Sequence, residues 1–254
     1  MPPKKSAPPP ASPKGQGAPA RGGRWRRAFR RLVRVLSAVA LALVIVWATL
    51  MALWAFVPPV STLMAARYLT FRAVDRRWLP LERFSPGLVA SVLASEDSQF
   101  CRHSGVDFDQ LRTVIAHPGK DGPRRGASTI DMQVARNLFL APVRWGLRKA
   151  VEIAMALAID KLWGKRRTLE IYLNVAEWGD GTFGAEAAAR RYFGRSASAL
   201  TARQAALLAV ALPNPFLRVP SRPRGLYARL VNLDMRRARD MGPWLDCLAP
   251  ARRR

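Results

Sequence analysis

A continuous apolar run near the N-terminus constrains this chain more than any other feature. Residues 35–57 form a stretch of 23 residues without a single charge. At about 1.5 Å per residue a helix of this length reaches about 34 Å, enough to cross a hydrocarbon core of about 30 Å. A cleaved signal peptide is the competing interpretation, but its apolar region usually has about 7–15 residues and ends at small residues. Here the run is longer and ends before Pro58 and Pro59, so we expect a retained membrane anchor.

Basic residues are concentrated immediately before this run. The chain has 42 Lys and Arg against 17 Asp and Glu, a net charge of +25, and no acidic residue precedes Asp75. Such an excess suits polyanions, which include nucleic acid, anionic lipid head groups and phosphorylated substrates. Residues 21–34 hold seven arginines directly before the span. We therefore expect the N-terminus to stay in the cytoplasm, the rest of the chain to lie outside it, and nucleic acid not to be a partner.

Composition divides the chain into five parts. Residues 1–23 are rich in Pro, Ala, Gly, Ser and Lys, which predicts a disordered cytoplasmic tail, and residues 24–57 are the basic flank and transmembrane helix. Residues 58–84 interleave arginines with aromatic and apolar side chains. This pattern fits a membrane-proximal collar at the interface or a linker packed on the domain. A folded domain at 85–245 and a basic tail at 246–254 complete the chain.

The folded part shows helical spacing and no run of alternating strand pattern, so we predict an all-α domain without internal repeats. Ser85 and Pro86 mark the start of a helix that ends at Glu96. Further helices are expected at 145–163, 166–174, 184–192, 201–212 and 225–240.

Besides Ser85, which we expect to cap the helix that starts at Pro86, three helix starts carry capping signals. Asp107 is expected to cap the helix that follows it. Ser128 with Asp131, and Thr201 with Gln204, resemble capping boxes, in which a hydroxyl and a side chain three residues later satisfy each other's backbone N–H groups.

The cysteines and histidines give weak signals. Cys101 and Cys247 do not make a disulfide framework, and their separation neither supports nor excludes pairing, so we expect two unpaired thiols. Neither cysteine has a histidine partner that suggests a nucleophile. His103 and His117 have no further ligands at zinc-site spacing, so the sequence predicts no metal site.

Glu96 is the first candidate for chemistry. It ends an apolar helix and precedes Asp97. Partial desolvation and a neighbouring like charge both raise a carboxyl pKa, which suits a general base or acid. The alternative is an ordinary solvated helix end.

Glu152 is the second candidate. It lies one helical turn after Arg148 in an otherwise apolar helix, so the two side chains share a face. A buried ion pair explains this pattern, but buried charges are costly and often mark functional sites.

The start of the helix after Gly126 could bind phosphate. Ser128 and Thr129 open this helix, and a helix start offers free N–H groups and a positive dipole end. A plain cap is the alternative for Ser128. Further donors that could reach the same anion follow in the sequence: Gln133, Arg136, Arg148 and Lys149.

Residues 179–184 match the dinucleotide-binding pattern GxGxxG. That pattern requires a preceding strand in a βαβ unit, whereas the preceding residues are helical in pattern. We therefore interpret these glycines as a turn joining two helices.

The order of several motifs resembles the peptidoglycan glycosyltransferases (glycosyltransferase family 51), over about residues 80–220. The motifs that carry the resemblance are Glu96-Asp97 with Phe100, His103, Gly105 and Asp107; the stretch from Gly126 to Asn137; Arg148-Lys149 with Glu152; and the stretch from Arg166 to Asn174. The likeness is strongest to the monofunctional, membrane-anchored transglycosylases of Gram-negative bacteria.

The resemblance implies a lysozyme-like, two-lobed helical fold and the polymerisation of lipid II, with inversion and release of undecaprenyl pyrophosphate. It implies that Glu96 is the catalytic base and that Glu152 supports the pyrophosphate or orients the site. The residues that it implies for holding the phosphates are Ser128, Gln133, Arg136, Arg148 and Lys149.

The resemblance also implies an inner-membrane protein with a periplasmic catalytic domain, acting on lipid II and the nascent glycan strand, with other cell-wall synthesis or cell-division proteins as further partners. No cofactor is required, although a divalent cation near the pyrophosphate is compatible with it. Two features depart from the family pattern. Arg136 stands where lysine is frequent, and Asp131-Met132 precede Gln133 where a second glutamine often occurs.

Two other function classes remain open at this point. A lysozyme-like lytic transglycosylase also places a glutamate at a helix end, but needs no phosphate-binding arginines. A non-enzymatic membrane scaffold would use the basic tail alone. A bifunctional penicillin-binding protein is excluded, because Ser-x-x-Lys and Lys-Thr-Gly are missing and the stretch after residue 220 is too short. We further expect loop 117–125 to be mobile and close to the acceptor.

Overall fold

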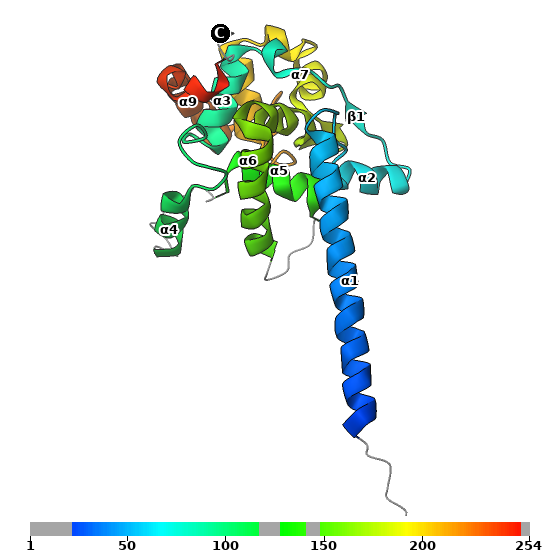
Figure 1. Cartoon of the computed structure of the whole chain (residues 1–254). Coiled ribbons are helices and arrows are strands. Elements are labelled where there is room, and N and C mark those ends of the chain that lie inside the picture. The colour runs from blue at the N-terminus through cyan, green and yellow to red at the C-terminus, as the bar shows by residue number, and fades with distance from the viewer. Residues whose placement is uncertain (1–21, 117–127, 141–147, 250–254) are drawn as a thin grey trace, which may run out of the picture. The chain divides into compact units, whose positions relative to one another are not determined.

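The computed structural model describes residues 22–116, 128–140 and 148–249, and the statements below concern these ranges. The tail at 1–21, the loop at 117–125 and Gly126 lie outside them. The chain divides into two compact units, Met1–Ala48 and Thr49–Arg254. Helix α1 (Gly22–Trp54) runs from the first into the second, and its part Trp25–Trp54 is long and apolar enough to cross a membrane (Figure 1). Most of its large apolar side chains are exposed, unlike those of a core helix.

The segment predicted as collar or linker has two different halves. Helix α2 (Thr62–Leu69) is capped by Ser61, whose hydroxyl accepts a hydrogen bond from the Met64 N–H at 3.2 Å. Strand β1 (Asp75–Arg76) and the short 3-10 helix η1 (Leu81–Arg83) follow. Apolar side chains from Leu79 to Phe84 are buried, whereas Tyr68 and Phe71 are exposed. The later half is therefore a packed linker, and the turn after α2 stays in contact with solvent.

Three helices make one layer of the folded unit. Helix α3 (Pro86–Glu96) packs against α8 (Ala202–Ala211) and α9 (Gly225–Arg239) (Figure 1). Ser85 caps α3, and Thr201 with Gln204 forms the predicted capping box at α8. The apolar side chains between α8 and α9 form a core of Ala206, Leu207, Val210, Ala211, Tyr227 and Val231.

A second layer is formed by α5 (Ile130–Phe139) and α6 (Arg148–Val175), and α4 (Phe108–Ala116) contributes Leu111 to its core. Val106, Met132 and Ala156 are buried together here, and α5 packs along α6. Gly164 interrupts α6 with a φ of 69°, which agrees with the predicted division into two helices. A positive φ favours glycine because it has no Cβ to clash with the backbone.

The cap of α5 differs from the prediction. Thr129, not Ser128, is the N-cap, and its hydroxyl accepts a hydrogen bond from the Met132 N–H at 3.2 Å. Asp131 is fully buried and pairs with Lys165 instead of completing a capping box. The prediction for Asp107 is confirmed, since its carboxylate accepts from the Gln110 N–H at 2.8 Å.

A small sheet corrects the expectation that the glycines at 179–184 join two helices. Strands β2 (Glu177–Gly179) and β3 (Thr182–Phe183) pair antiparallel, and β1 pairs parallel with β3, in the order β1-β3-β2. The strands have two or three residues each, too short to show an alternating pattern. Helix α7 (Ala185–Phe193) and η2 (Ala197–Ala199) follow, and the domain is otherwise all-α as predicted.

The two cysteines are paired, which corrects the prediction of unpaired thiols. Cys101 and Cys247 form a disulfide with their Cα atoms 5.5 Å apart. The packing of α9 against α3 brings the last segment, η3 (Gly242–Trp244) and η4 (Asp246–Leu248), to the loop after α3. The fold therefore continues into residues that we had assigned to a basic tail.

Candidate active site

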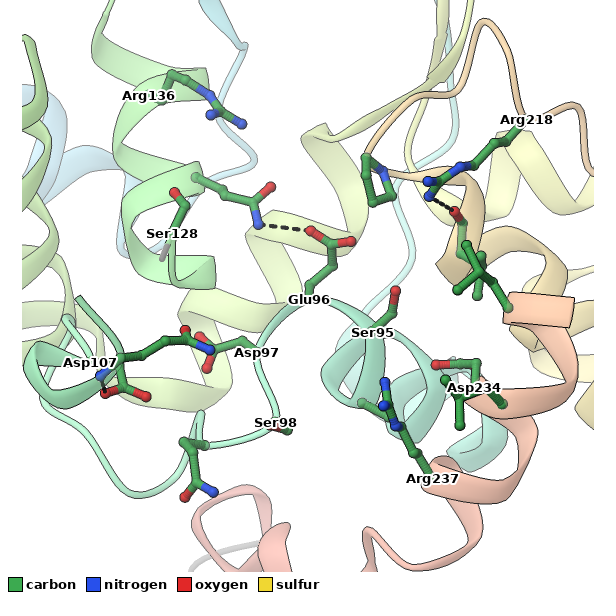
Figure 2. A pocket seen from close by; sticks show the side chains of 18 residues that line it. Ser95, Glu96, Asp97, Ser98, Asp107, Ser128, Arg136, Arg218, Asp234 and Arg237 are labelled. Carbon is green, nitrogen blue, oxygen red and sulfur yellow. Dashed lines mark hydrogen bonds between the residues drawn. The ribbon is translucent and has the colours of Figure 1, made fainter. Parts of the chain in front are cut away.

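A cavity of about 390 Å³ lies beside the C-terminal end of α3. Figure 2 shows Glu96 facing it, with Ser128 and Arg136 on one side and Arg218, Asp234 and Arg237 on the other. Both helical layers contribute to the lining. The lining residues are Ala94, Ser95, Glu96, Asp97, Ser98, Gln99, Asp107, Gln110, Ser128, Gln133, Arg136, Val210, Pro213, Arg218, Leu230, Leu233, Asp234 and Arg237.

The Glu96 side chain is half-buried at the edge of this cavity and has no ion-pair partner among the described residues. The Gln133 side-chain N–H donates to Glu96 Oε2 at 3.0 Å, while Oε1 is buried and accepts no hydrogen bond within the described part of the chain. Burial raises the pKa of Glu96, and Asp97 raises it further, while Gln133, Arg136 and Arg218 act in the opposite direction. A carboxylate of raised pKa that faces a cavity is suited to take up a proton.

A second hydrogen bond fixes the orientation of the Gln133 side-chain amide. The Tyr172 hydroxyl donates to Gln133 Oε1 at 3.2 Å, so the amide nitrogen is left to face Glu96. Tyr172 is 1% exposed, and burial raises the pKa of its hydroxyl well above the usual value, so it stays protonated and remains a donor. Tyr172 belongs to the stretch from Arg166 to Asn174 that carries the family resemblance, but no role in the site was predicted for it.

Three arginines line the cavity from two directions, beside the carboxylates of Glu96, Asp97, Asp107 and Asp234. Arg136 comes from α5, as predicted, but Arg218 and Arg237 come from the far side and were missed. The Arg218 guanidinium donates to the Val210 carbonyl at 2.9 Å, which fixes it beside the cavity. Neither arginine belongs to a short motif, and the one available signal was the turn-forming Pro213-Asn214-Pro215 shortly before Arg218.

The two hydroxyls that were predicted to bind phosphate have different surroundings in the structure. Ser128 lines the cavity, and its Oγ is buried without a hydrogen bond among the described residues. Thr129 is 2% exposed, and its hydroxyl donates to the Gly105 carbonyl at 2.6 Å while capping α5. The Thr129 side chain therefore serves the fold and is not available to a ligand, which corrects the expectation for this residue.

Glu152 lies in a different cluster on α6, outside the cavity lining. Its carboxylate is 3.1 Å from Arg148 Nε and 3.6 Å from Lys149 Nζ. Partial burial lowers the pKa of Lys149, and Glu152 opposes this effect. The predicted pairing of Glu152 with Arg148 is confirmed, and Lys149 adds a second cation to the same carboxylate.

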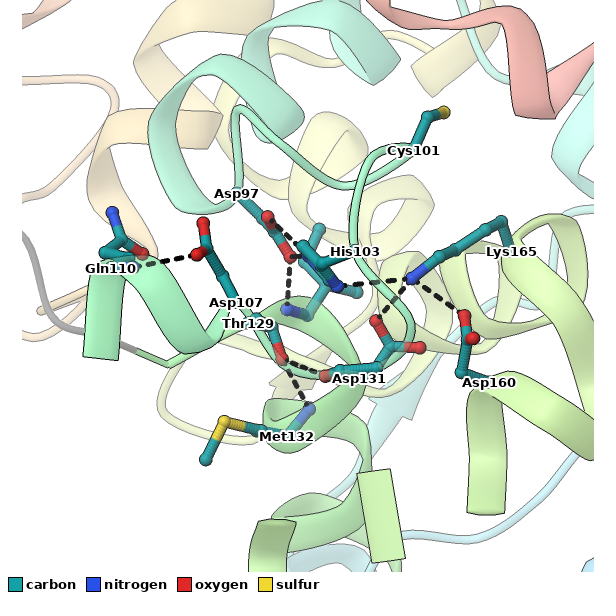
Figure 3. A network of polar contacts seen from close by, with 12 residues as sticks. Asp97, Cys101, His103, Asp107, Gln110, Thr129, Asp131, Met132, Asp160 and Lys165 are labelled. Carbon is teal, nitrogen blue, oxygen red and sulfur yellow. Dashed lines mark hydrogen bonds and ion pairs between the residues drawn. The ribbon is translucent and has the colours of Figure 1, made fainter. Parts of the chain in front are cut away.

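A buried polar network fixes the loop that follows Glu96 (Figure 3). The Asp97 carboxylate accepts from the Ile130 N–H at 2.9 Å and lies 3.0 Å from His103 Nε2. The other ring nitrogen of His103 lies 3.5 Å from Lys165 Nζ, which pairs with Asp131 at 3.1 Å and with Asp160 at 2.8 Å. This network joins the loop after α3 to α5 and α6.

Three side chains of the same network lie close enough together to hold a metal ion. One oxygen of Asp97, one nitrogen of His103 and one oxygen of Asp131 lie within 4.8 Å of one another, a proximity that sequence spacing did not reveal. The Lys165 ammonium already contacts two members of this group. Burial raises the pKa of Asp131 to about 7, with Lys165 as the main opposing influence. The Lys165 ammonium thus supplies positive charge to Asp131 and to Asp160.

The remaining motif residues shape the site's frame. Phe100 is buried under Lys165, whose Nζ lies 4.5 Å from the ring centroid. Gly105 has a φ of 80°, and a Cβ there would approach the Ala156 carbonyl oxygen to 2.5 Å. The Asn174 side chain bonds both backbone groups of Leu79 at 2.8 and 2.9 Å. Asn137 contributes its backbone carbonyl, which accepts a hydrogen bond from the Thr62 hydroxyl at 3.2 Å.

Comparison with known proteins identifies relatives of this sequence. The family described as Transglycosylase matches residues 63–237. The chain is 51% identical over 223 residues to a biosynthetic peptidoglycan transglycosylase of Agrobacterium fabrum, covering 87% of this chain and 98% of that protein. Proteins of the same name in Brucella suis biovar 1 and Rhodospirillum centenum are 49% and 51% identical, covering 88% and 78% of this chain and 99% and 84% of their own lengths.

Proposed function

Since the chain belongs to the transglycosylase family and is a glycosyltransferase of peptidoglycan synthesis, we propose that it polymerises lipid II. The 4-hydroxyl oxygen of an incoming lipid II attacks the anomeric carbon of the growing strand. The bond from that carbon to the pyrophosphate breaks, the configuration inverts, and undecaprenyl pyrophosphate leaves. The hydroxyl proton goes to the enzyme.

The surroundings of Glu96 are the observation that carries this proposal. Its Oε1 is buried beside the cavity, and the carboxyl group has a raised pKa and makes no ion pair among the described residues. A base in this state gains stability on accepting a proton, because the neutral acid is easier to bury than the anion. The Gln133 amide keeps Glu96 Oε2 in place, so Oε1 is the oxygen that can receive the proton.

The arginines around the cavity support the departure of the pyrophosphate. Arg136 on one side, and Arg218 and Arg237 on the other, provide fixed positive charge where negative charge develops. Ser128 adds a hydroxyl whose Oγ has no hydrogen bond among the described residues. A planar guanidinium can bind two phosphate oxygens at once, so Arg136 suits this role although lysine is frequent there in the family.

Arg148, Lys149 and Glu152 act as a group in this scheme. Glu152 neutralises part of the charge of its two neighbours and holds their side chains on one face of α6. We assign it to orienting these cations toward the phosphates, and no proton transfer passes through it. The arginines and Lys149 supply the positive charge, so the proposal includes no resident metal, and addition of a chelator to the polymerisation assay tests this point.

The membrane anchor and the disulfide support a catalytic domain outside the cytoplasm. Helix α1 is apolar over Trp25–Trp54 and follows an arginine-rich flank, which favours a cytoplasmic N-terminus. Disulfides persist in oxidising compartments such as the periplasm and are rare in the cytosol. The Cys101–Cys247 pair is therefore an independent reason for the same orientation, with a single pass through the inner membrane.

Purified full-length protein with lipid II tests the proposal. We expect glycan strands to form with the wild-type protein and not with Glu96→Gln. Solubilisation of finished cell wall without any polymer from lipid II would establish the lytic alternative instead. Polymerisation by Glu96→Gln at the wild-type rate would show that Glu96 is not the base.

A further inference from the structure

A second cavity, with a volume of about 260 Å³, lies next to the cavity that Glu96 faces. The two cavities share four lining residues, which are Ala94, Ser98, Gln99 and Arg237. Ser98 comes two residues after Glu96, so the Cα atoms of these two residues lie at most about 7 Å apart (Figure 2). A group attached to a sugar that reacts at Glu96 is therefore within reach of the second cavity.

The C-terminal segment provides the rest of this second cavity. Asp240 and Met241 follow the end of α9, and Trp244 belongs to η3. Met241 is buried and Trp244 is 38% exposed. Asp240 is exposed and makes no ion pair among the described residues. The second cavity therefore combines apolar side chains with a carboxylate that is open to solvent.

Three contacts hold the C-terminal segment in place. Cys247, three residues after Trp244, is joined by the disulfide to Cys101. The Arg102 guanidinium lies 5.0 Å from the centroid of the Trp244 ring, and the Trp244 N–H donates to the Met241 carbonyl at 2.8 Å. The walls of the second cavity are therefore fixed before any ligand binds, which lowers the entropy cost of binding.

The second cavity offers charges of both signs. The planar guanidinium of Arg237 suits a carboxylate, and the carboxylate of Asp240 suits an ammonium group. The Trp244 ring and the Met241 side chain can pack against the methylene groups between two such charges. The matching ligand is therefore an amino-acid group that carries a carboxylate and an ammonium on a short apolar stem.

Other parts of a lipid-linked sugar match the second cavity less well. A bare sugar has no charge for Arg237 or Asp240, and a phosphate beside Arg237 would also face the like charge of Asp240. The peptides that peptidoglycan carries on its sugars do contain amino-acid groups. A guanidinium has five N–H donors, so Arg237 can bind such a group and still contribute positive charge to the first cavity.

From these observations we propose that the second cavity binds a zwitterionic amino-acid group in the peptide of lipid II. The proposal rests on the proposed function, since it concerns a further part of the same substrate. Arg237 binds the carboxylate, Asp240 binds the ammonium, and Trp244 packs against the stem between them. Asp240 and Trp244 therefore determine which substrate is recognised, and they do not touch the atoms that react.

Lipid II whose peptide carries such a group, compared with the same lipid II acetylated at the free amino group, tests this. Acetylation removes the positive charge and leaves the sugars and the pyrophosphate intact. With the full-length protein in detergent, we expect the KM of the acetylated form to be about five- to tenfold higher, because a charge-assisted hydrogen bond is lost. The kcat should change by less than about twofold, because the amino group is remote from the reacting atoms.

The variant Asp240→Asn assigns this preference to the second cavity. We expect its KM for unmodified lipid II to rise to about that of the acetylated form, and acetylation to have no further effect. The matched control is Asp246→Asn in η4, an exposed carboxylate of the same segment outside the cavity lining. This control should keep the wild-type preference. Both variants should unfold at the wild-type Tm, because both side chains are exposed.

Two results would overturn the assignment of the second cavity. The wild-type protein could use both forms of lipid II with the same KM, or Asp240→Asn could keep the preference for the unmodified form. Absence of glycan strands with unmodified lipid II would contradict the proposed function instead. In that case, calorimetric titration of Glu96→Gln with both forms still tests the second cavity. A Kd about five- to tenfold higher for the acetylated form would support it, and equal values would refute it.

Discussion

Glu96 is half-buried and Glu152 is buried, both lie near arginines, and they differ in what neutralises them. Glu96 has a neutral amide at one oxygen and no ion pair among the described residues, whereas Glu152 contacts two cations. Glu96 borders the cavity, and Glu152 does not. The difference teaches that closeness to arginine in the sequence does not identify a base. A buried carboxylate accepts a proton readily when its charge is left uncompensated.

Glu96→Gln should give the largest effect. The exchange keeps the shape and removes the proton acceptor, so polymerisation of lipid II should fall by about 10²- to 10⁴-fold. Thermal unfolding should be unchanged or shifted upward, because a poorly solvated charge has been removed. A large drop in Tm together with the activity would mean that Glu96 resembles Glu152 and holds the fold.

The double variant Cys101→Ser, Cys247→Ser should have the second largest effect. The disulfide attaches the loop after Glu96 to the C-terminal segment, and the sequence has no further cysteine that could hold the Glu152 helix in the same way. We expect a loss of about 2–4 kcal/mol in the free energy of unfolding, measured by urea titration of the full-length protein in detergent. A reducing agent should reproduce this loss in the wild type and leave the double variant unaffected. Unfolding curves that coincide for the two proteins would contradict the pairing.

Glu152→Gln should have a smaller effect than Glu96→Gln, and it should lower the stability of the fold, which Glu96→Gln should not. It leaves Arg148 and Lys149 without their shared counter-charge, and we expect about 1–2 kcal/mol lower stability. The loss is limited because both cations are partly exposed and screened by solvent. Thermal unfolding at low and high salt measures it, with the difference from wild type shrinking at high salt. An unchanged Tm at low salt would argue against the ion-pair cluster.

Gln133→Ala should have the smallest effect, seen in the pH profile. Gln133 stabilises the ionised form of Glu96, so its removal should raise the pKa of Glu96 further. The base works only when deprotonated, so the acidic limb of the rate profile should move to higher pH, by less than about one pH unit. Initial rates of polymerisation across the acid range measure the limb. A shift of the acidic limb to lower pH would show that Gln133 raises the pKa of Glu96 and does not lower it.

Local signals in the sequence predicted most of the helices and one side of the cavity. Ser85 and Thr201 cap helices as expected, because a cap depends on residues within one turn. The spacing of Arg148 and Glu152 predicted their contact for the same reason. Glu96 at the end of an apolar helix indicated a desolvated carboxylate, and its raised pKa agrees.

Features that depend on contacts between distant segments were not predictable in this way. Arg218 and Arg237 reach the cavity only because α8 and α9 pack on α3. Asp131 was interpreted as a cap partner, yet the kink at Gly164 brings Lys165 to it. The capping role fell to Thr129 instead of Ser128, since one residue of register decides which hydroxyl faces the helix N–H groups.

The disulfide has a consequence for the order in which the protein is completed. Its two cysteines are 146 residues apart, so Cys247 is synthesised long after Cys101. The loop that follows Glu96 can therefore be locked only after the chain as far as Cys247 has been translated and exported. A product that ends after α9 and before Cys247 would contain the sequence motifs named above and still lack this closure, so full stability would require synthesis beyond Cys247.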